Sequence, residues 1–160
     1  MHISYSPIGY FKTPHTTIED MPIQPRGAVG IRGTVSVNAE YAEGLADLDG
    51  FSHVIVLYHF HKVTSHALTV VPFLDTQSRG VFATRSPKRP NSIGLSVMRL
   101  VSVRGCELEL ENVDVLDGTP VLDIKPYVPG FDVWPVEQVG WLEKGEQDAE
   151  IMRSDDRFKD

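Results

Sequence analysis

Cysteine is nearly absent from the sequence, which has only Cys106 among its 160 residues. A single cysteine excludes a disulfide within the chain, disfavours a cysteine-based zinc site and is typical of a reducing compartment. The N-terminal sequence MHISYSPIGY has neither the basic start nor the apolar stretch of a secretory signal. We therefore expect a cytoplasmic protein.

Long hydrophobic runs are also missing. The longest covers residues 54–60 and is interrupted by His59. It is far shorter than the about 20 apolar residues that span a bilayer as a helix. We therefore expect no association with the membrane.

Several common catalytic and cofactor motifs are absent as well. The spacing of Gly27, Gly30 and Gly33 lacks the G-x-G opening of a dinucleotide-binding fingerprint. There is no Walker A, G-x-S-x-G or H-E-x-x-H sequence. Nothing therefore points to a Rossmann dinucleotide site, a serine hydrolase or a zinc protease.

Apolar residues make up 41% of the sequence, which suffices for the core of one domain. They are arranged in short apolar or alternating runs, separated by Gly, Pro, Asn and Asp. This spacing predicts a barrel or sandwich of short strands. The expected strands cover residues 3–11, 28–37, 53–61, 67–71, 93–103, 107–116 and 121–127. Residues 41–48 are expected to form a short helix or turn.

Charge is distributed unevenly along the chain. The net charge is −7, yet no acidic residue lies between Asp75 and Glu107. Six basic residues fall in that interval: Arg79, Arg85, Lys88, Arg89, Arg99 and Arg104. Residues 80–96 (GVFATRSPKRPNSIGLS) predict a strand, a turn rich in Pro and Asn, and a return strand. Such a turn either binds phosphate or carboxylate groups or is a solvated basic loop.

A second polar pattern lies in residues 121–127. On a strand, Asp123, Lys125 and Tyr127 would share one face, and Leu122 and Ile124 the other. A buried row of this kind could move a proton, whereas a simpler interpretation is a structural Asp–Lys pair at a sheet edge.

Histidines form a third pattern. His59 and His61 would lie about 6–7 Å apart on one strand face, a spacing that suits metal ligands. No Glu or Cys completes a known metal motif, so we favour a polar or hydrogen-bonded role for these side chains and expect no metal.

Four segments within residues 5–130 resemble one family. They are PIGY, GL-x-x-L-x-GFSH, GVFATRSPKRPNSIGLS and D-x-LDGTPVLDIKPYVP, in that order. On these motifs the sequence resembles the TsaA/TrmO-like proteins. Characterised members of that family are tRNA (adenine-37-N6)-methyltransferases that depend on S-adenosyl-L-methionine.

The resemblance implies a mainly β fold: a compact single-sheeted β-barrel with short helical segments and a charged C-terminal tail. It assigns residues 1–142 to the barrel and residues 143–160 to the tail, where well-studied bacterial enzymes carry a further domain. It also implies a homodimer with the cofactor beside the subunit interface. By motif position, the cofactor contacts are Ile23, Gln24, Pro25, His61, Lys62, Arg85, Leu95, Asn112, Val113 and Asp114. Ile23 stands where the family usually has Arg.

The family reaction methylates N6 of an adenosine 37 that bears a threonylcarbamoyl group, so the implied partner is the anticodon loop of tRNA. The lone pair of that nitrogen is delocalised, so a general base would assist the reaction. The candidates are Asp117, Asp123, Lys125 and Tyr127, and Lys125 could serve only if burial lowered its pKa. The expected contacts with substrate phosphates are Lys88, Arg89 and Asn91.

Three other functions remain open on the sequence. The same barrel could methylate a small molecule, or it could bind S-adenosyl-L-methionine without catalysis. A barrel enzyme with a metal held by His59 and His61 is the third.

Overall fold

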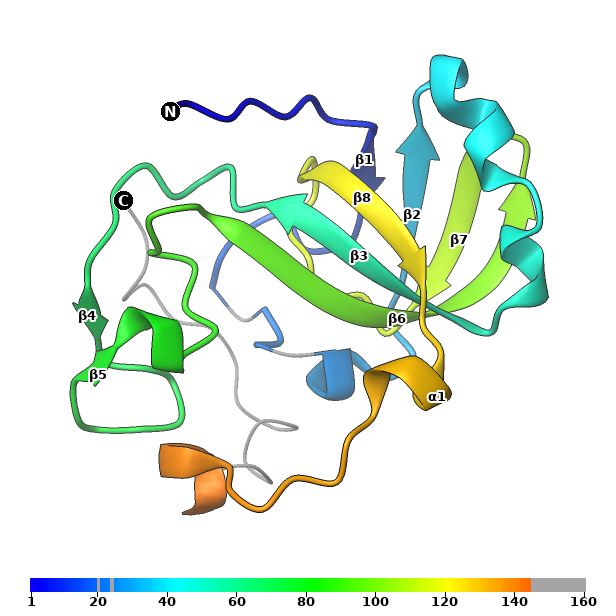
Figure 1. Cartoon of the computed structure of the whole chain (residues 1–160). Helices are drawn as coiled ribbons and strands as arrows, with labels where there is room; N and C mark the ends of the chain where they lie inside the picture. Colours follow the sequence, from blue (N-terminus) through cyan, green and yellow to red (C-terminus); the bar gives the residue numbers. More distant parts are fainter. Residues whose placement is uncertain (20, 24, 145–160) are drawn as a thin grey trace.

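The computed structural model describes residues 1–19, 21–23 and 25–144. Six antiparallel strands close into one barrel in the order β1-β2-β7-β6-β3-β8 (Figure 1). Their bounds are β1 Gly9–Lys12, β2 Arg32–Val37, β3 His53–His59, β6 Ile93–Arg104, β7 Glu107–Glu111 and β8 Pro120–Pro126. The expected mainly β fold with a single barrel is therefore confirmed.

Strand alternation determines which side chains fill the barrel. In β3, Val54, Val56 and Tyr58 are buried and the residues between them are not. Full burial of one aliphatic side chain stabilises the fold by about 1.5–3 kcal/mol. The buried residues of the core are Phe11, Val35, Val37, Val54, Val56, Tyr58, Met98, Leu100, Leu108, Leu110, Val113, Val115 and Val121.

A second, two-stranded sheet is separate from the barrel. It pairs β4 (Thr69–Val70) with β5 (Arg79–Gly80), and Val70 and Val81 form its small apolar cluster. The strand–turn–strand unit predicted over residues 80–96 is correct only in part: a strand lies on each side of the turn, but β5 pairs with β4 whereas β6 pairs with β3 and β7. Residues 81–92 instead connect the small sheet to the barrel, and we call them the basic loop.

Several predicted strand ends also need correction. The first predicted strand pairs only from Gly9 onward. Residues 25–28 form the 3₁₀ helix η1 (Pro25–Ala28), so β2 begins later, at Arg32. β7 ends at Glu111 because Asn112 adopts a left-handed φ of 67°, which turns the chain out of the ladder.

The predicted faces of β8 are correct only in part. The register shifts at this strand, since Leu57 pairs with Asp123 but Tyr58 pairs with Val121. Leu122 is therefore the extra residue of a bulge. Val121 and Ile124 face the core, so Leu122 and Ile124 do not share one face of the strand as predicted.

The helical segments are short. The predicted segment at residues 41–48 corresponds to two 3₁₀ helices, η2 (Ala39–Leu45) and η3 (Leu48–Gly50). The others are η4 (Val81–Ala83), α1 (Pro129–Asp132) and η5 (Gly140–Lys144). Residues 145–160 of the expected tail lie outside the described residues. In the described part of the chain, no helix has the length and apolar character needed to cross a membrane.

Candidate functional site

A cluster of three polar side chains lies inside one end of the otherwise apolar barrel. Tyr58 comes from β3, Ser96 from β6, and Asp114 from the segment that follows β7. They are only 6%, 1% and 7% exposed, respectively. Burying polar groups is unfavourable unless they bond to one another, so we consider their hydrogen bonds next. We call Tyr58, Ser96 and Asp114 the polar cluster.

The polar cluster forms a chain of two hydrogen bonds. Ser96 Oγ donates to Asp114 Oδ1 at 2.8 Å, and Tyr58 Oη lies 2.9 Å from Ser96 Oγ. A serine hydroxyl has one hydrogen. Because Ser96 uses it for the carboxylate, the Tyr58 hydroxyl donates to Ser96. These two hydrogen bonds therefore stabilise the ionised form of Asp114.

Burial strongly affects the acidity of this carboxyl group. It raises the pKa of Asp114 to about 7, although the hydrogen bonds from Ser96 and from its own backbone N–H act in the opposite direction. Asp114 can thus gain or lose a proton near neutral pH. Burial, with a contribution from the Asp114 charge, also raises the pKa of Tyr58 far above its ordinary value, so the phenol stays protonated.

Tyr58 is accommodated by a glycine on the neighbouring strand. It pairs across the sheet with Gly94, and a Cβ atom added at Gly94 would collide with the Tyr58 ring. The ring also packs edge-on against Phe11 and Phe60, with centroids 6.0 and 5.5 Å away. The hydroxyl of Tyr58 is therefore held toward Ser96 by packing on three sides.

The segment that carries Asp114 is fixed by the N-terminal part of the chain. The Val113 carbonyl lies 2.8 Å from His15 Nε2, and the Val113 N–H donates to the Ile31 carbonyl. Asn112 Oδ1 accepts the Gly30 N–H at 3.0 Å. The side chain of Val113 is fully buried in the core, between Asn112 and Asp114.

The basic loop brings Arg85 to the same end of the barrel. Arg85 is exposed, and its positive charge opposes the rise in the pKa of Tyr58. Within the described residues it makes no hydrogen bond or ion pair. Arg85 and Asp114, predicted from distant motifs, therefore both act on the same tyrosine.

Arg89 has hydrogen-bond partners within its own loop. Its Nη1 atom donates to three carbonyl oxygens of the basic loop: Thr84 at 2.9 Å, Ser86 at 3.1 Å and Val81 at 3.4 Å. This guanidinium thus holds the loop in shape through Nη1, a role that was not predicted from the sequence. Lys88, half-buried, and Asn91, exposed, lie on the same loop.

The other predicted cofactor residues are more dispersed. His61 and Lys62 lie in the turn after β3, and burial together with the charge of Lys62 lowers the pKa of His61. Leu95 is 44% exposed and points outward from β6, opposite to Ser96. Ile23 is half-buried, Pro25 begins η1, and Gln24 lies outside the described residues.

The predicted metal spacing does not occur. β3 ends at His59, so His61 lies beyond the strand and the strand spacing no longer applies. Among residues 1–19, 21–23 and 25–144, no three His, Cys, Asp or Glu side chains are placed to hold a metal ion.

The four predicted proton acceptors do not converge on one point. Asp117 Oδ1 accepts the Thr13 N–H at 2.9 Å. Asp123 and Lys125 form an exposed ion pair of 2.7 Å on the outer face of β8. This carboxylate raises the pKa of Lys125, whereas a lysine base would need a lowered one. Tyr127 lies further along, its ring edge-on to His53 at 6.4 Å.

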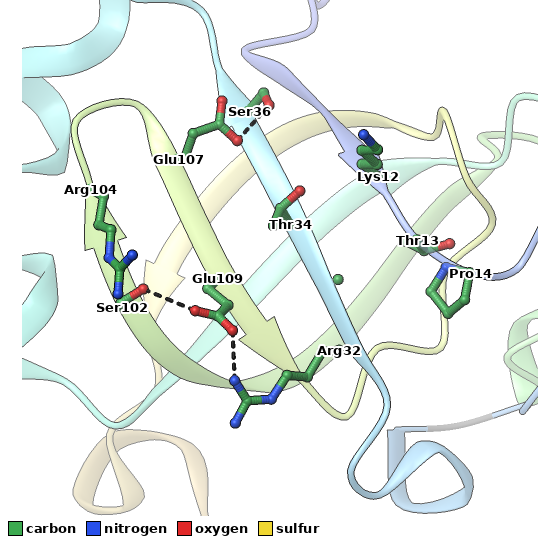
Figure 2. Close-up of a pocket in the computed structure, with 11 residues that line it drawn as sticks. Lys12, Thr13, Pro14, Arg32, Thr34, Ser36, Ser102, Arg104, Glu107 and Glu109 are labelled. Atoms are coloured by element: carbon green, nitrogen blue, oxygen red, sulfur yellow. Dashed lines mark hydrogen bonds and ion pairs between the residues drawn. The ribbon is translucent and has the colours of Figure 1, made fainter.

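A groove of about 700 Å³ runs over the outer wall of the barrel (Figure 2). Three of its five charged side chains, Arg32, Glu107 and Glu109, are paired with neighbours. Arg32 lies 2.6 Å from Glu109, and the hydroxyls of Ser102 and Ser36 donate to Glu109 and Glu107. No residue predicted for cofactor or substrate lines it. We therefore place the candidate site at the polar cluster and not in this groove.

Tyr58 and Ser96 were not predicted from the sequence. Ser96 does give a signal, because it alternates with Gly94 and Met98 on the face of its strand that turns inward. A hydroxyl on a buried face requires a polar partner. That partner, Asp114, is distant in sequence and could be identified only from the closed barrel.

Comparison with known families gives a match over residues 10–133. The matching family model is described as the tRNA-methyltransferase O N-terminal domain. Among curated proteins, the chain is 51% identical over 156 residues to a probable S-adenosyl-L-methionine-binding protein of Pyrococcus abyssi, covering 98% of this chain and 85% of that protein.

Two further relatives are longer than this chain. It is 42% identical to the mouse tRNA (adenine(37)-N6)-methyltransferase, over 79% of this chain but only 31% of that enzyme. Among solved structures, TrmO from Pseudomonas aeruginosa superimposes with a TM-score of 0.74 at 40% identity. That match covers 88% of this chain and 63% of the Pseudomonas chain.

Proposed function

Because the chain belongs to the tRNA-methyltransferase O family, we propose that it binds S-adenosyl-L-methionine and transfers the methyl group to N6 of adenosine 37 in tRNA. The preferred substrate adenosine carries a threonylcarbamoyl group. The observation that supports this most is the pair of opposite charges at one end of the barrel, Asp114 and Arg85.

The pair suits the amino-acid end of the cofactor. That end bears an ammonium and a carboxylate, so it needs one anionic and one cationic partner. Asp114 is already hydrogen-bonded by Ser96 and is poised to accept a donor such as the ammonium or the adenine amine. Arg85, which has no partner of its own within the described residues, would bind the carboxylate. Positioning by these groups would supply much of the catalysis.

The Asp114 carboxylate should contact the cofactor at a point distant from the sulfonium group. The positive charge on sulfur disappears as the methyl group leaves, so a close anion would stabilise the ground state more than the transition state. Asp114 fits this requirement because it is fixed inside the barrel wall by Ser96 and cannot follow the sulfur atom.

We further propose that the active form is a homodimer. Leu95 faces outward from β6, whereas Asp114 faces the barrel interior, so one chain cannot easily place both against one cofactor. Leu57 lies between Leu95 and Asp123 in a row across three neighbouring strands. A second copy packed on this outer face would bring Leu95 and Asp123 of one subunit toward the cofactor of the other.

In that arrangement Asp123 is our proposed proton acceptor. Its carboxylate is 44% exposed and bonded to Lys125, so it is accessible to a substrate. Lys125, which its raised pKa keeps in the ammonium form, would hold the carboxylate in position. Lys62 and Lys88 would contact phosphates of the anticodon loop.

A second candidate function is binding of S-adenosyl-L-methionine without catalysis. It is favoured by the names of the archaeal relatives, which describe only binding of this compound. It differs from the first in predicting that no methyl group reaches tRNA.

The deciding experiment incubates the protein with labelled S-adenosyl-L-methionine and with tRNA that either carries or lacks threonylcarbamoyl-adenosine 37. Nucleoside mass spectrometry then identifies the methylated product. Arg85→Ala should abolish transfer. Arg99→Ala is the matched control, because Arg99 is an exposed arginine already 3.5 Å from Glu111. Methylation of neither tRNA by the wild type would contradict the proposed reaction.

A further inference from the structure

After it leaves the barrel, the chain returns to the basic loop. α1 ends at Asp132, residues 133–140 are exposed, and η5 reaches the small sheet formed by β4 and β5 (Figure 1). At this contact Trp141 Nε1 donates to the carbonyl oxygen of Ala83 at 2.7 Å. The tryptophan lies beyond residue 133, where the match to the family model ends.

The indole ring has a second partner on the small sheet. The guanidinium carbon of Arg79 lies 5.9 Å from its centroid, which is within the range of a cation–π contact. Arg79 is itself fixed, because its Nε donates to Asp75 Oδ2 at 2.6 Å. Asp75 also accepts the backbone N–H groups of Thr76 and Gln77. The side chain of Arg79 that faces Trp141 is therefore held by a hydrogen bond of its own.

The position of Ala83 gives this contact its importance. Ala83 is the last residue of η4 and lies two residues before Arg85. Arg89 binds the carbonyls of Val81, Thr84 and Ser86 from within the basic loop. The Ala83 carbonyl is bound instead by Trp141. The two side chains thus hold different carbonyls of the loop that presents Arg85.

We propose that Trp141 is a positioning residue that fixes the basic loop so that Arg85 is presented to the ligand. The proposal rests on the proposed function only in naming S-adenosyl-L-methionine as that ligand. The ordering of the loop by Trp141 is a separate claim that needs no ligand.

The chain offers a matched pair of variants to test this. It has two tryptophans, Trp134 and Trp141. Trp134 is 78% exposed and has no partner among the described residues. Trp141→Phe removes the Nε1–H donor and keeps an aromatic ring beside Arg79, so it should fold. Trp134→Phe makes the same chemical change at a site without the contact.

The first measurement is hydrogen–deuterium exchange of the ligand-free protein. In Trp141→Phe, we expect the amides of residues 81–89 to exchange about three- to tenfold faster, the effect of losing one hydrogen bond. The barrel strands and the Tm should be unchanged, and Trp134→Phe should match the wild type. Equal exchange in all three proteins would overturn the proposal.

The second measurement is calorimetric titration with S-adenosyl-L-methionine. Trp141→Phe should bind about three- to tenfold more weakly than the wild type, and Trp134→Phe should bind equally well. Faster exchange without weaker binding would overturn the positioning role. If the wild type does not bind the compound, the proposed function fails, and exchange alone still decides whether Trp141 orders the loop.

Discussion

Replacing Asp114 with asparagine should stabilise the protein at alkaline pH and not at acidic pH. The variant keeps an oxygen that accepts the Ser96 hydroxyl but removes the buried charge. Burial raises the pKa of Asp114 to about 7 in the folded protein, from an ordinary value of 3.8. At a pH between these two pKa values, Asp114 carries a proton in the folded protein but has released it in the unfolded chain.

The sign and size of the effect follow from this difference. Because the folded state binds more protons, this group makes stability fall as pH rises from about 4 to 7, and the loss is complete above the folded pKa. One pKa unit corresponds to about 1.4 kcal/mol, so the total is at most about 4 kcal/mol. Asp114→Asn avoids this cost, and its stability relative to wild type should therefore increase with pH.

Urea unfolding at pH 5, 6, 7 and 8 measures this directly. The difference in free energy of unfolding between Asp114→Asn and the wild type should increase over that pH range by at least about 1 kcal/mol. Asp47→Asn is the control. Asp47 is exposed, and asparagine tolerates its φ of 68°. Asp47→Asn should therefore change the free energy of unfolding by no more than about 0.5 kcal/mol at every pH. A gap for Asp114→Asn that is constant, or that narrows with pH, would refute the assignment of a raised pKa.

Other consequences are equally specific. Gly94→Ala should lower the free energy of unfolding by about 1–3 kcal/mol and weaken cofactor binding, because the added methyl group displaces the Tyr58 ring. A variant with the stability and affinity of the wild type would show that the close approach is unimportant. Asp123→Ala should change the free energy of unfolding by less than about 1 kcal/mol, since the ion pair of Asp123 with Lys125 is exposed. The same variant should reduce turnover much more than cofactor affinity. Full turnover would remove Asp123 from the mechanism. Arg89→Ala should speed tryptic cleavage within the basic loop, and a cleavage rate equal to that of the wild type would count against its role in holding the carbonyls.

The architecture was largely predictable because alternation is a local property. The sequence that forms β3 has Val54 and Val56 two positions apart, and the sequence that forms β6 has Met98 on its inward face. All three side chains are fully buried. Closure of the barrel and its strand order depend on pairing between distant segments. The resemblance of the motifs to a known family implied the closed barrel, whereas the strand order is known only from the structure.

The site was predictable in its parts and not in its assembly. Arg85 and Asp114 were identified from separate motifs, but the sequence could not show that Tyr58 and Ser96 form a hydrogen-bonded chain with Asp114. The hydrogen bonds of Arg89 to the loop carbonyls could not be predicted for a related reason. A guanidinium suits phosphate and backbone carbonyls alike, and only the folded loop shows which it binds.

Binding of S-adenosyl-L-methionine is the claim on which the other functional assignments depend, and isothermal titration tests it most directly. The compound should be titrated into the wild type, Arg85→Ala and Arg99→Ala at pH 8, where Asp114 is ionised. We predict saturable binding to the wild type, equal binding to Arg99→Ala and loss of at least tenfold in affinity for Arg85→Ala. No binding to the wild type, or equal binding to all three proteins, would contradict the placement of the cofactor between Arg85 and Asp114.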